Sequence, residues 1–170
     1  VLMGMLRINK PGFIIYGGSM KPTYKNMNNS KNRIETKKMD IVSVFEGYGE
    51  LLNKKITKET YQDIVETSCD MKCGSCSGMY TANTMALILE VMGITLPNSA
   101  SNPSLSMEKL NECNEAYDII YNLLEKDIKP KDIITMEALI NGIKIGYLMG
   151  GSTNLVIHLL AIANETNIKL

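Results

Sequence analysis

Residues 79–93, MYTANTMALILEVMG, are apolar on nearly every side of a helix, with Gly93 placed to end it. A helix of this kind has to be buried over most of its circumference, because leaving apolar surface in water is unfavourable. Residues 155–165, LVIHLLAIANE, show the same pattern. The chain of 170 residues is 45% hydrophobic, which is enough to bury such helices in a core. The sequence therefore predicts a layered, helix-rich α/β fold.

Two segments before the cysteines predict a strand and a loop. Residues 12–18, GFIIYGG, form a short β-rich run ended by two glycines, which predicts a buried strand and a tight turn. Residues 21–40 are polar, rich in Asn and Lys, and without periodicity, so we expect a solvated loop. Glu35 and Asp40 dilute the basic charge of this loop, which disfavours a basic binding patch.

Further helices are predicted at residues 41–52, 57–67, 106–126 and 135–149. Thr57 and Ser106 are in position to cap the second and third of them. The third helix has an apolar stripe that we expect to face the core, made of Leu110, Cys113, Tyr117, Ile120 and Leu124. Cys113 is then a small buried hydrophobic residue, and His158 is interpreted as a core histidine and not as a ligand.

Charge and composition exclude several classes of partner. The 18 basic and 18 acidic residues balance, with a pI near 6.8, so nothing favours nucleic acid or an anionic membrane surface. The apolar runs are too short to span a bilayer, and the start of the sequence does not resemble a secretion signal.

Crowded cysteines favour a reducing compartment over a secreted disulfide framework. The opening VLMGMLRINKP lacks an initiator Met, which favours an internal segment of a longer protein.

Three thiols lie close together in residues 69–83, CDMKCGSCSGMYTAN. An iron–sulfur cluster fits loops of this kind, since Gly74 and Gly78 would let the backbone approach it. A redox pair formed by Cys73 and Cys76 before a helix is a second interpretation, and three unrelated cysteines are a third. Structural zinc is disfavoured, because it needs four ligands and the chain offers few other candidates.

One further cluster class shares the spacing. Cys69, Cys73 and Cys76 are separated by three and two residues, as in radical enzymes that cleave S-adenosylmethionine. That motif normally has an aromatic residue before its last cysteine, where this chain has Ser75. The spacing matches and the surrounding residues do not.

Longer strings of residues carry a closer resemblance. CGSCSGMYTANTM, GITLPNSASNPS and MGGSTNLVIHLLAIA resemble the dihydroxy-acid dehydratases of branched-chain amino-acid synthesis, which are related to the sugar-acid dehydratases. MLRINKPGFIIYGGSMKP and DIVSVFEGYGELLNKKIT resemble segments upstream of the cysteines in that family, in the same order. The resemblance covers nearly the whole chain.

The resemblance implies that residues 1–170 are part of an N-terminal α/β cofactor domain, the cluster-binding part, with the C-terminal domain absent. It implies an iron–sulfur cluster, 2Fe–2S or 4Fe–4S, and Mg²⁺. Cys76 would be the last of three cluster ligands and Cys73 an accompanying cysteine. The other two ligands, the Mg²⁺ ligands and the catalytic base would lie outside the chain. Cys69 departs from the family pattern by one position, and the loop after Lys25 is longer.

The implied activity is that of a hydro-lyase, which dehydrates 2,3-dihydroxy acids to 2-keto acids. The implied parent is a homodimer in the cytoplasm, or in an organelle of a eukaryote. With no catalytic residue of its own, the chain alone is expected to be inactive. The alternatives left open are the radical S-adenosylmethionine enzyme and a non-catalytic binding remnant.

Residues 150–154, GGSTN, are a second candidate site element. Glycines, hydroxyls and an amide at a helix start suit an anion such as a carboxylate, which predicts substrate binding by Gly151, Ser152, Thr153 and Asn154. A turn and helix cap joining two buried helices needs the same residue types. Asn83, soon after the cysteines, has the same two interpretations.

Overall fold

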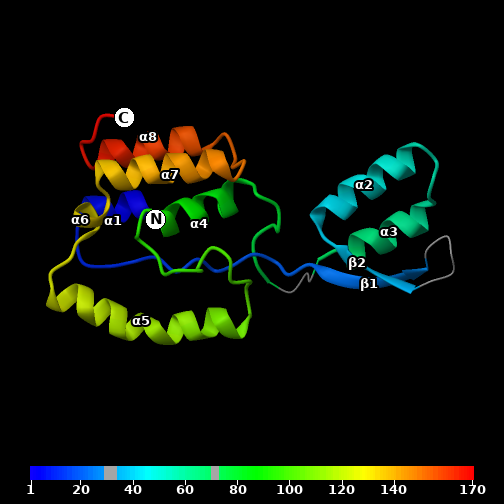
Figure 1. Cartoon of the computed structure of the whole chain (residues 1–170), viewed down its shortest axis with the longest axis horizontal. Helices are drawn as coiled ribbons and strands as arrows, with labels where there is room; N and C mark the ends of the chain where they lie inside the picture. The colour runs from blue at the N-terminus through cyan, green and yellow to red at the C-terminus, as the bar shows by residue number, and fades with distance from the viewer. Residues whose placement is uncertain (29–33, 70–72) are drawn as a thin grey trace. The chain divides into compact units, whose positions relative to one another are not determined.

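Helices dominate the computed structural model, which describes residues 1–28, 34–69 and 73–170 (Figure 1). Two β-strands form an antiparallel pair, and the remaining elements are helical. The chain divides into two compact units. The first joins Val1–Gly18 to Met79–Leu170, and the second is Ser19–Gly78. The predicted helix-rich character is confirmed, while the sheet is smaller than an α/β layer requires.

The second unit contains a β-hairpin where the sequence predicted a loop. β1 (Thr23–Asn28) pairs with β2 (Ile34–Met39), with Thr23 opposite Met39. The expectation of a solvated loop is wrong for these residues, and residues 29–33 lie outside the described part of the chain. β2 is exposed except for Met39, and both strands are mostly polar in sequence, so they lack the apolar alternation by which a strand is recognised.

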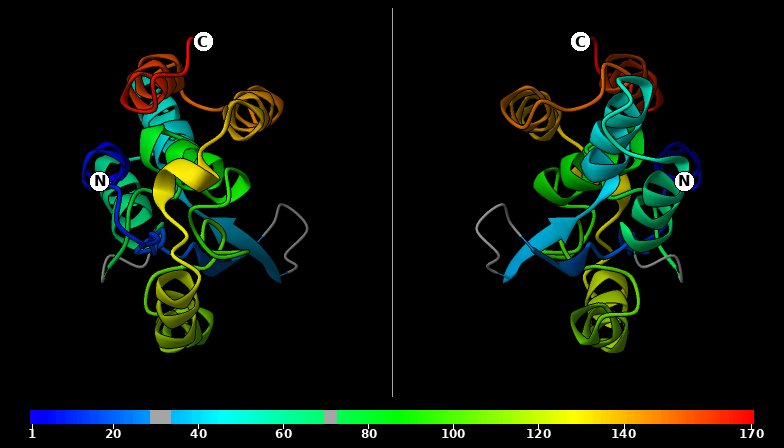
Figure 2. Two further views of the ribbon diagram at one scale, coloured as in Figure 1. Left: turned by 90° about the vertical axis from the view of Figure 1, so that its left-hand side faces the viewer. Right: turned by 90° about the vertical axis from the view of Figure 1, so that its right-hand side faces the viewer.

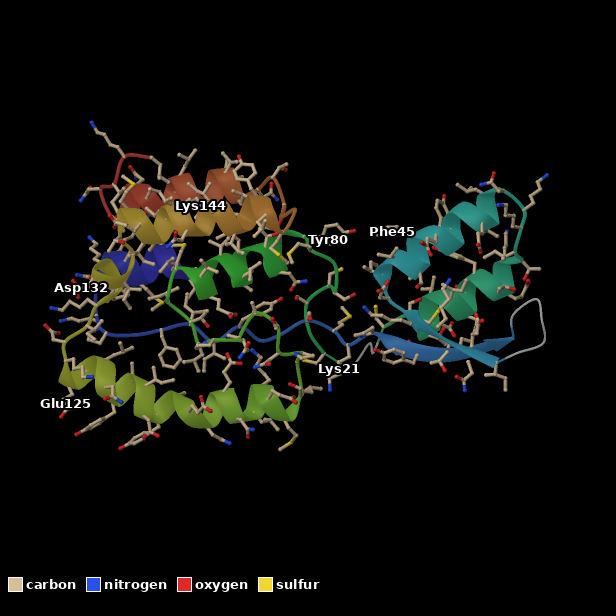
Figure 3. All side chains as sticks on the ribbon, in the orientation of Figure 1. Lys21, Phe45, Tyr80, Glu125, Asp132 and Lys144 are labelled. Carbon is tan, nitrogen blue, oxygen red and sulfur yellow. The ribbon has the colours of Figure 1, made fainter. Side chains whose placement is uncertain are left out.

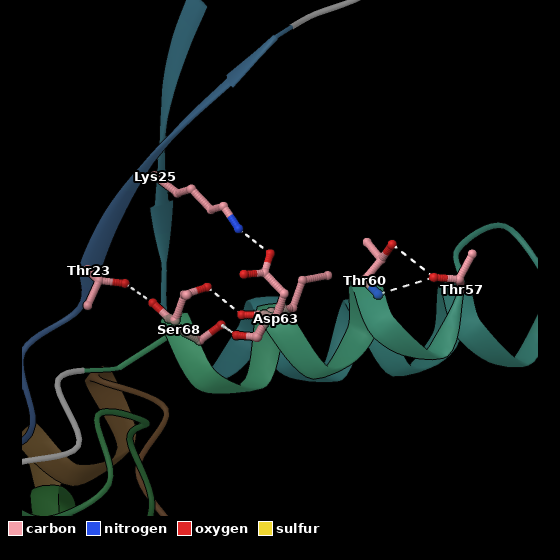
Figure 4. Close-up of polar contacts among 8 residues, drawn as sticks. Thr23, Lys25, Thr57, Thr60, Asp63 and Ser68 are labelled. Carbon is pink, nitrogen blue, oxygen red and sulfur yellow. Dashed lines mark hydrogen bonds and ion pairs between the residues drawn. The ribbon is translucent and has the colours of Figure 1, made fainter.

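Side chains of the hairpin are tied to the second helix after it, residues 58–67 (Figure 4). Lys25 pairs with Asp63, and the hydroxyl of Thr23 donates to the carbonyl of Thr67. These contacts attach the hairpin to that helix.

Two helices complete the second unit, as predicted. They are α2 (Ile41–Leu52) and α3 (Lys58–Thr67). Asp40 caps α2 by accepting from the Val42 amide at 2.9 Å, and Thr57 caps α3 as predicted, accepting from the Thr60 amide at 3.2 Å. A Cβ added at Gly47 would lie 3.1 Å from Ile64 Cδ1, so this glycine permits the close packing of α2 on α3.

The first unit is built around α4 (Thr81–Val91), α7 (Met136–Leu148) and α8 (Leu155–Glu165), all predicted (Figure 2). Gly93, with φ of 83°, follows α4 where expected. The core consists of Leu2, Leu6, Ile88, Met92, Ile94, Ile134, Leu139, Leu155, Leu159, Ile162 and Ala163. Gly142 brings α7 onto α4, because a Cβ there would lie 3.0 Å from Ile88 Cγ2.

The start of the chain differs from expectation. Residues 2–8 form a helix that was not predicted, α1 (Leu2–Ile8), and the short α6 (Pro130–Ile133) was not predicted either. The predicted strand at residues 12–18 is wrong: Ile14 alone makes a parallel bridge, to Thr95. Glycine is required at the end of this segment, since Gly18 has φ of 89° and a Cβ there would overlap the Ser104 amide nitrogen.

The long helix α5 (Met107–Glu125) has the opposite orientation to the one predicted. Ser106 caps it as expected, accepting from the Lys109 amide at 3.1 Å. However, Cys113 and most of the apolar stripe are exposed, while Lys109 and Glu112 are buried. His158, predicted to be in the core, is also exposed, since it lies between the inward-facing Leu155 and Leu159 of α8.

Candidate functional site

The cysteine segment lies in the second unit, after α3. Cys69 and Cys76 are half-buried and Cys73 is exposed, and residues 70–72 between them lie outside the described chain. The amide of Met20 donates to the carbonyl of Ser75 at 2.8 Å, next to a parallel bridge between Ser19 and Ser75. The backbone just before Cys76 is therefore fixed against the segment that leads into β1.

Glycine is required in this segment. Gly74 has φ of 119°, a conformation that L side chains rarely adopt. It lies between Cys73 and Cys76, so it sets the direction in which the chain reaches the second thiol. Cys69 contacts the Ser77 hydroxyl, with Sγ and Oγ 3.8 Å apart.

The cysteine thiols are the right kind of ligand for an iron–sulfur cluster, but too few of them come together to hold one. All four cysteines of the chain are described, and none forms a disulfide. Among the described residues, no three His, Cys, Asp or Glu side chains come together as a metal-binding group. A cluster takes several cysteine thiolates, so this part of the chain offers one portion of a ligand set and needs further ligands from elsewhere.

The GGSTN turn lies in the first unit, between α7 and α8. Its amides and hydroxyls bond to the first turns of α4. The Ser152 amide donates to Thr84 Oγ1 at 2.9 Å, the hydroxyls of Ser152 and Thr81 are 3.2 Å apart, and Asn154 Nδ2 donates to Thr81 Oγ1 at 2.8 Å. A Cβ on Gly151 would lie 2.7 Å from Thr84 Cγ2, so only glycine fits between the turn and α4.

Much of the polar character of this turn is used internally. Ser152 contributes its amide and its hydroxyl to α4, and Asn154 contributes its side-chain amide. Thr153 and Asn154 are exposed at the start of α8. Thr153 also lines a small pocket of about 130 Å³ with Gly150 and Gly151. The turn therefore combines a structural role with an exposed edge.

Thr81 and Thr84, which position this turn, were not predicted from the sequence. Their spacing of three residues places both on one face of α4, and this spacing is visible in the TANT string. Their partners lie about 70 residues later, and local sequence patterns do not reveal contacts at that separation.

Asn83 is held by a residue from the start of the chain. Tyr16 Oη donates to Asn83 Oδ1 at 2.7 Å, and the Tyr16 amide donates to Ser99 Oγ at 3.3 Å. Lys109 Nζ lies 5.8 Å from the centre of the Tyr16 ring. Tyr16 therefore links the first turn of α4 to the loop before α5.

Comparison with known proteins identifies the family. Residues 1–170 match the family described as dihydroxy-acid/6-phosphogluconate dehydratase N-terminal, and the chain belongs to this family. The predicted family is therefore confirmed, which favours the dehydratase over the radical S-adenosylmethionine alternative.

Individual relatives agree with this assignment. The mitochondrial dihydroxy-acid dehydratase of Saccharomyces cerevisiae is 46% identical over 170 residues, which are 100% of this chain and 28% of the relative. A dihydroxy-acid dehydratase of Francisella tularensis subsp. novicida is 43% identical over 169 residues, 99% of this chain and 28% of the relative. The chain thus spans little more than a quarter of the length of these proteins. In the described residues, every helix is too short or too polar to cross a membrane.

Proposed function

We propose that this chain is part of a dihydroxy-acid dehydratase, a hydro-lyase that converts 2,3-dihydroxy acids to 2-keto acids in branched-chain amino-acid synthesis. Residues 1–170 would form the cluster-binding part of its N-terminal α/β domain, with a C-terminal domain outside the chain. The observation that carries this proposal is the family match over all 170 residues, together with dehydratase relatives at 43% and 46% identity.

Cys76 is the proposed cluster ligand of this chain, with Cys73 as an accompanying cysteine. In support, Cys76 is half-buried in a segment fixed by the Met20–Ser75 bond, while Cys73 is exposed. A bound cluster, 2Fe–2S or 4Fe–4S, supplies a Lewis-acidic iron for the departing hydroxyl group. Mg²⁺ and the remaining cluster ligands would be held by residues outside this chain. The thiolate of Cys76 would hold the cluster and move no proton.

The GGSTN turn is the proposed substrate-binding element. Gly151, Ser152, Thr153 and Asn154 precede α8 at its N-terminus, where a carboxylate is favoured by the helix dipole. Thr81 and Thr84 would act by positioning, because they hold Ser152 and Asn154 from α4. The exposed hydroxyl of Thr153 is the group best placed to reach a ligand.

Iron binding tests the cofactor assignment. A hybrid protein carries this chain in place of the matching segment of the yeast relative, which lets partner ligands be supplied from outside residues 1–170. After anaerobic reconstitution, iron and sulfide per chain are measured for Cys76→Ser, Cys73→Ser and the control Cys113→Ser, whose thiol is exposed on α5. We expect Cys76→Ser to lose the cluster, Cys73→Ser to retain part of it, and the control to retain all of it. A full cluster in Cys76→Ser would contradict the assignment.

Activity tests the proposed reaction separately. The hybrid is expected to convert a 2,3-dihydroxy acid to its 2-keto acid, and the 170-residue chain alone is expected to show no turnover. A cluster that forms in the chain alone and responds to S-adenosylmethionine would favour the radical enzyme.

We further propose that the parent is a homodimer of the cytoplasm or of an organelle. Sedimentation of the full-length protein would test the oligomeric state, and its localisation in the cell would test the compartment.

A further inference from the structure

Helix α5 presents apolar side chains to solvent along most of its length. Leu110 is 51% exposed, Tyr117 72%, Tyr121 56% and Leu124 59%, and the Cys113 side chain between them is also exposed. The rings of Tyr117 and Tyr121 stack, with centroids 6.4 Å apart. These five residues, Leu110, Cys113, Tyr117, Tyr121 and Leu124, are called the α5 seam.

The polar face of α5 is fixed toward the protein. Lys109 Nζ lies 2.6 Å from Glu112 Oε2 and donates to the Ser99 carbonyl at 2.9 Å. Asn102 Nδ2 donates to the same Glu112 oxygen at 3.4 Å. The side chains of Lys109 and Glu112 are 8% and 4% exposed. Rotating α5 to bury its seam would break this buried pair, so the outward direction of the seam is part of the fold.

The spacing of the seam is that of a helix that packs against another helix. Leu110, Tyr117 and Leu124 recur every seven residues, with Cys113 and Tyr121 between them. One edge of the seam is acidic, because Asp118 and Glu125 each follow a seam residue and are exposed (Figure 3 labels Glu125 at the end of α5). A partner helix with Lys or Arg along its facing edge would complement this charge.

A second copy of α5 is a poor match. In an antiparallel pair of α5 helices, the edge that carries Asp118 would face the same acidic edge of the other copy. By contrast, the chain spans 28% of the yeast relative, so most of a relative's polypeptide lies outside the matched region.

We propose that the α5 seam is the docking site for an amphipathic helix with a basic edge, contributed by the part of the dehydratase polypeptide outside residues 1–170. This inference rests on family membership and on the geometry of α5, and it does not depend on the proposed cluster or substrate residues.

Alkylation of Cys113 tests the proposal. Its rate of reaction with iodoacetamide is measured by peptide mass spectrometry, in this chain alone and in the hybrid protein described above. We expect rapid reaction in the chain alone and at least roughly tenfold slower reaction in the hybrid, because a docked helix covers the thiol. Equal rates in the two proteins would overturn the proposal.

Matched substitutions separate docking from folding. Tyr117→Asp is expected to leave the melting temperature of the chain alone nearly unchanged, while in the hybrid it restores rapid alkylation of Cys113. Asn122→Asp introduces the same charge on an exposed position outside the seam, beside the acidic edge, so the melting temperature and the protection of Cys113 in the hybrid should both be retained. Protection of Cys113 that persists in the Tyr117→Asp hybrid would show that the seam is not the contact.

Sedimentation of the chain alone decides between the proposed partner and a second copy, whether or not the hybrid folds. A monomer over the accessible concentrations supports a partner from the remaining polypeptide. A dimer that Tyr117→Asp dissociates would overturn the proposal in favour of self-association.

Discussion

The amide of Ser152 donates a 2.9 Å hydrogen bond to Oγ1 of Thr84, a side chain that is only 2% exposed. Thr84→Val keeps the shape of the side chain and removes the acceptor, so the Ser152 amide loses its partner. We expect the free energy of unfolding, measured with urea, to fall by about 1–3 kcal/mol. Thr84→Ser, which keeps the hydroxyl, should lose only about 0.8 kcal/mol for one methyl group. Equal losses in the two variants would show that the hydrogen bond does not hold the turn.

Gly151 should tolerate no side chain. In Gly151→Ala the new Cβ would lie 2.7 Å from Thr84 Cγ2 and 2.9 Å from the Gly146 carbonyl oxygen, and the backbone cannot yield as a flexible side chain does. Such overpacking should lower the free energy of unfolding by about 1–3 kcal/mol. Gly4→Ala is the matched control, since Gly4 lies within α1 with nothing within 4 Å of its added Cβ. It should stabilise the protein by about 0.5–1 kcal/mol, and destabilisation by both variants would point to a cause other than steric overlap.

Glu90 fixes the loop between α4 and α5. Its two carboxylate oxygens accept from the amides of Asn98, at 2.8 Å, and Ala100, at 2.9 Å. Glu90→Gln retains one acceptor and replaces the other by a donor, so one amide is released. We expect faster hydrogen exchange at Asn98 or Ala100 and a loss of about 1–3 kcal/mol in unfolding free energy. Glu115→Gln, an exposed change on α5, should leave this exchange unaltered.

Acid should weaken the attachment of α1 to α8. The Arg7 guanidinium hydrogen-bonds Glu165, with Nε 2.8 Å from Oε2, and lowers the pKa of that carboxyl group. A lowered pKa in the folded state gives stability that is present above the ordinary glutamate pKa, about 4.3, and is lost as the pH falls through the folded value. Unfolding followed between pH 7 and pH 3 should therefore show a smaller acid-induced loss in Arg7→Gln than in the unchanged protein. Identical pH profiles would remove this pair as a source of acid sensitivity.

Features set by a few neighbouring residues were predictable from the sequence. Thr57 and Ser106 cap the helices that they were expected to cap, and Gly93 follows α4 as expected, because each acts on backbone groups within a few positions. The apolar segments of α4, α7 and α8 were also found as helices. In each case the determining pattern lies within the element itself.

Features set by distant contacts were not predictable. The helical spacing of the apolar stripe predicted that it faces inward. Instead, the pairing of Lys109 with Glu112 and the Ser99 carbonyl allows two charges to be buried on the opposite side of α5. The hairpin was not predicted because its polar strand sequences have no apolar alternation. At the candidate site, the cysteines and the GGSTN string were recognisable, whereas the threonines that hold the turn were identified only by the fold.

The bond between Arg7 and Glu165 joins residues 158 positions apart, and it has a consequence for synthesis on the ribosome. Translation at about 5–20 residues per second places roughly 8–30 s between the appearance of α1 and that of its partner α8. During this interval the apolar side chains of Leu2 and Leu6, buried in the finished protein, have no α8 to cover them. The nascent chain is therefore expected to be a client for holding chaperones until α8 emerges, and shortening that wait by circular permutation would reduce its dependence on them.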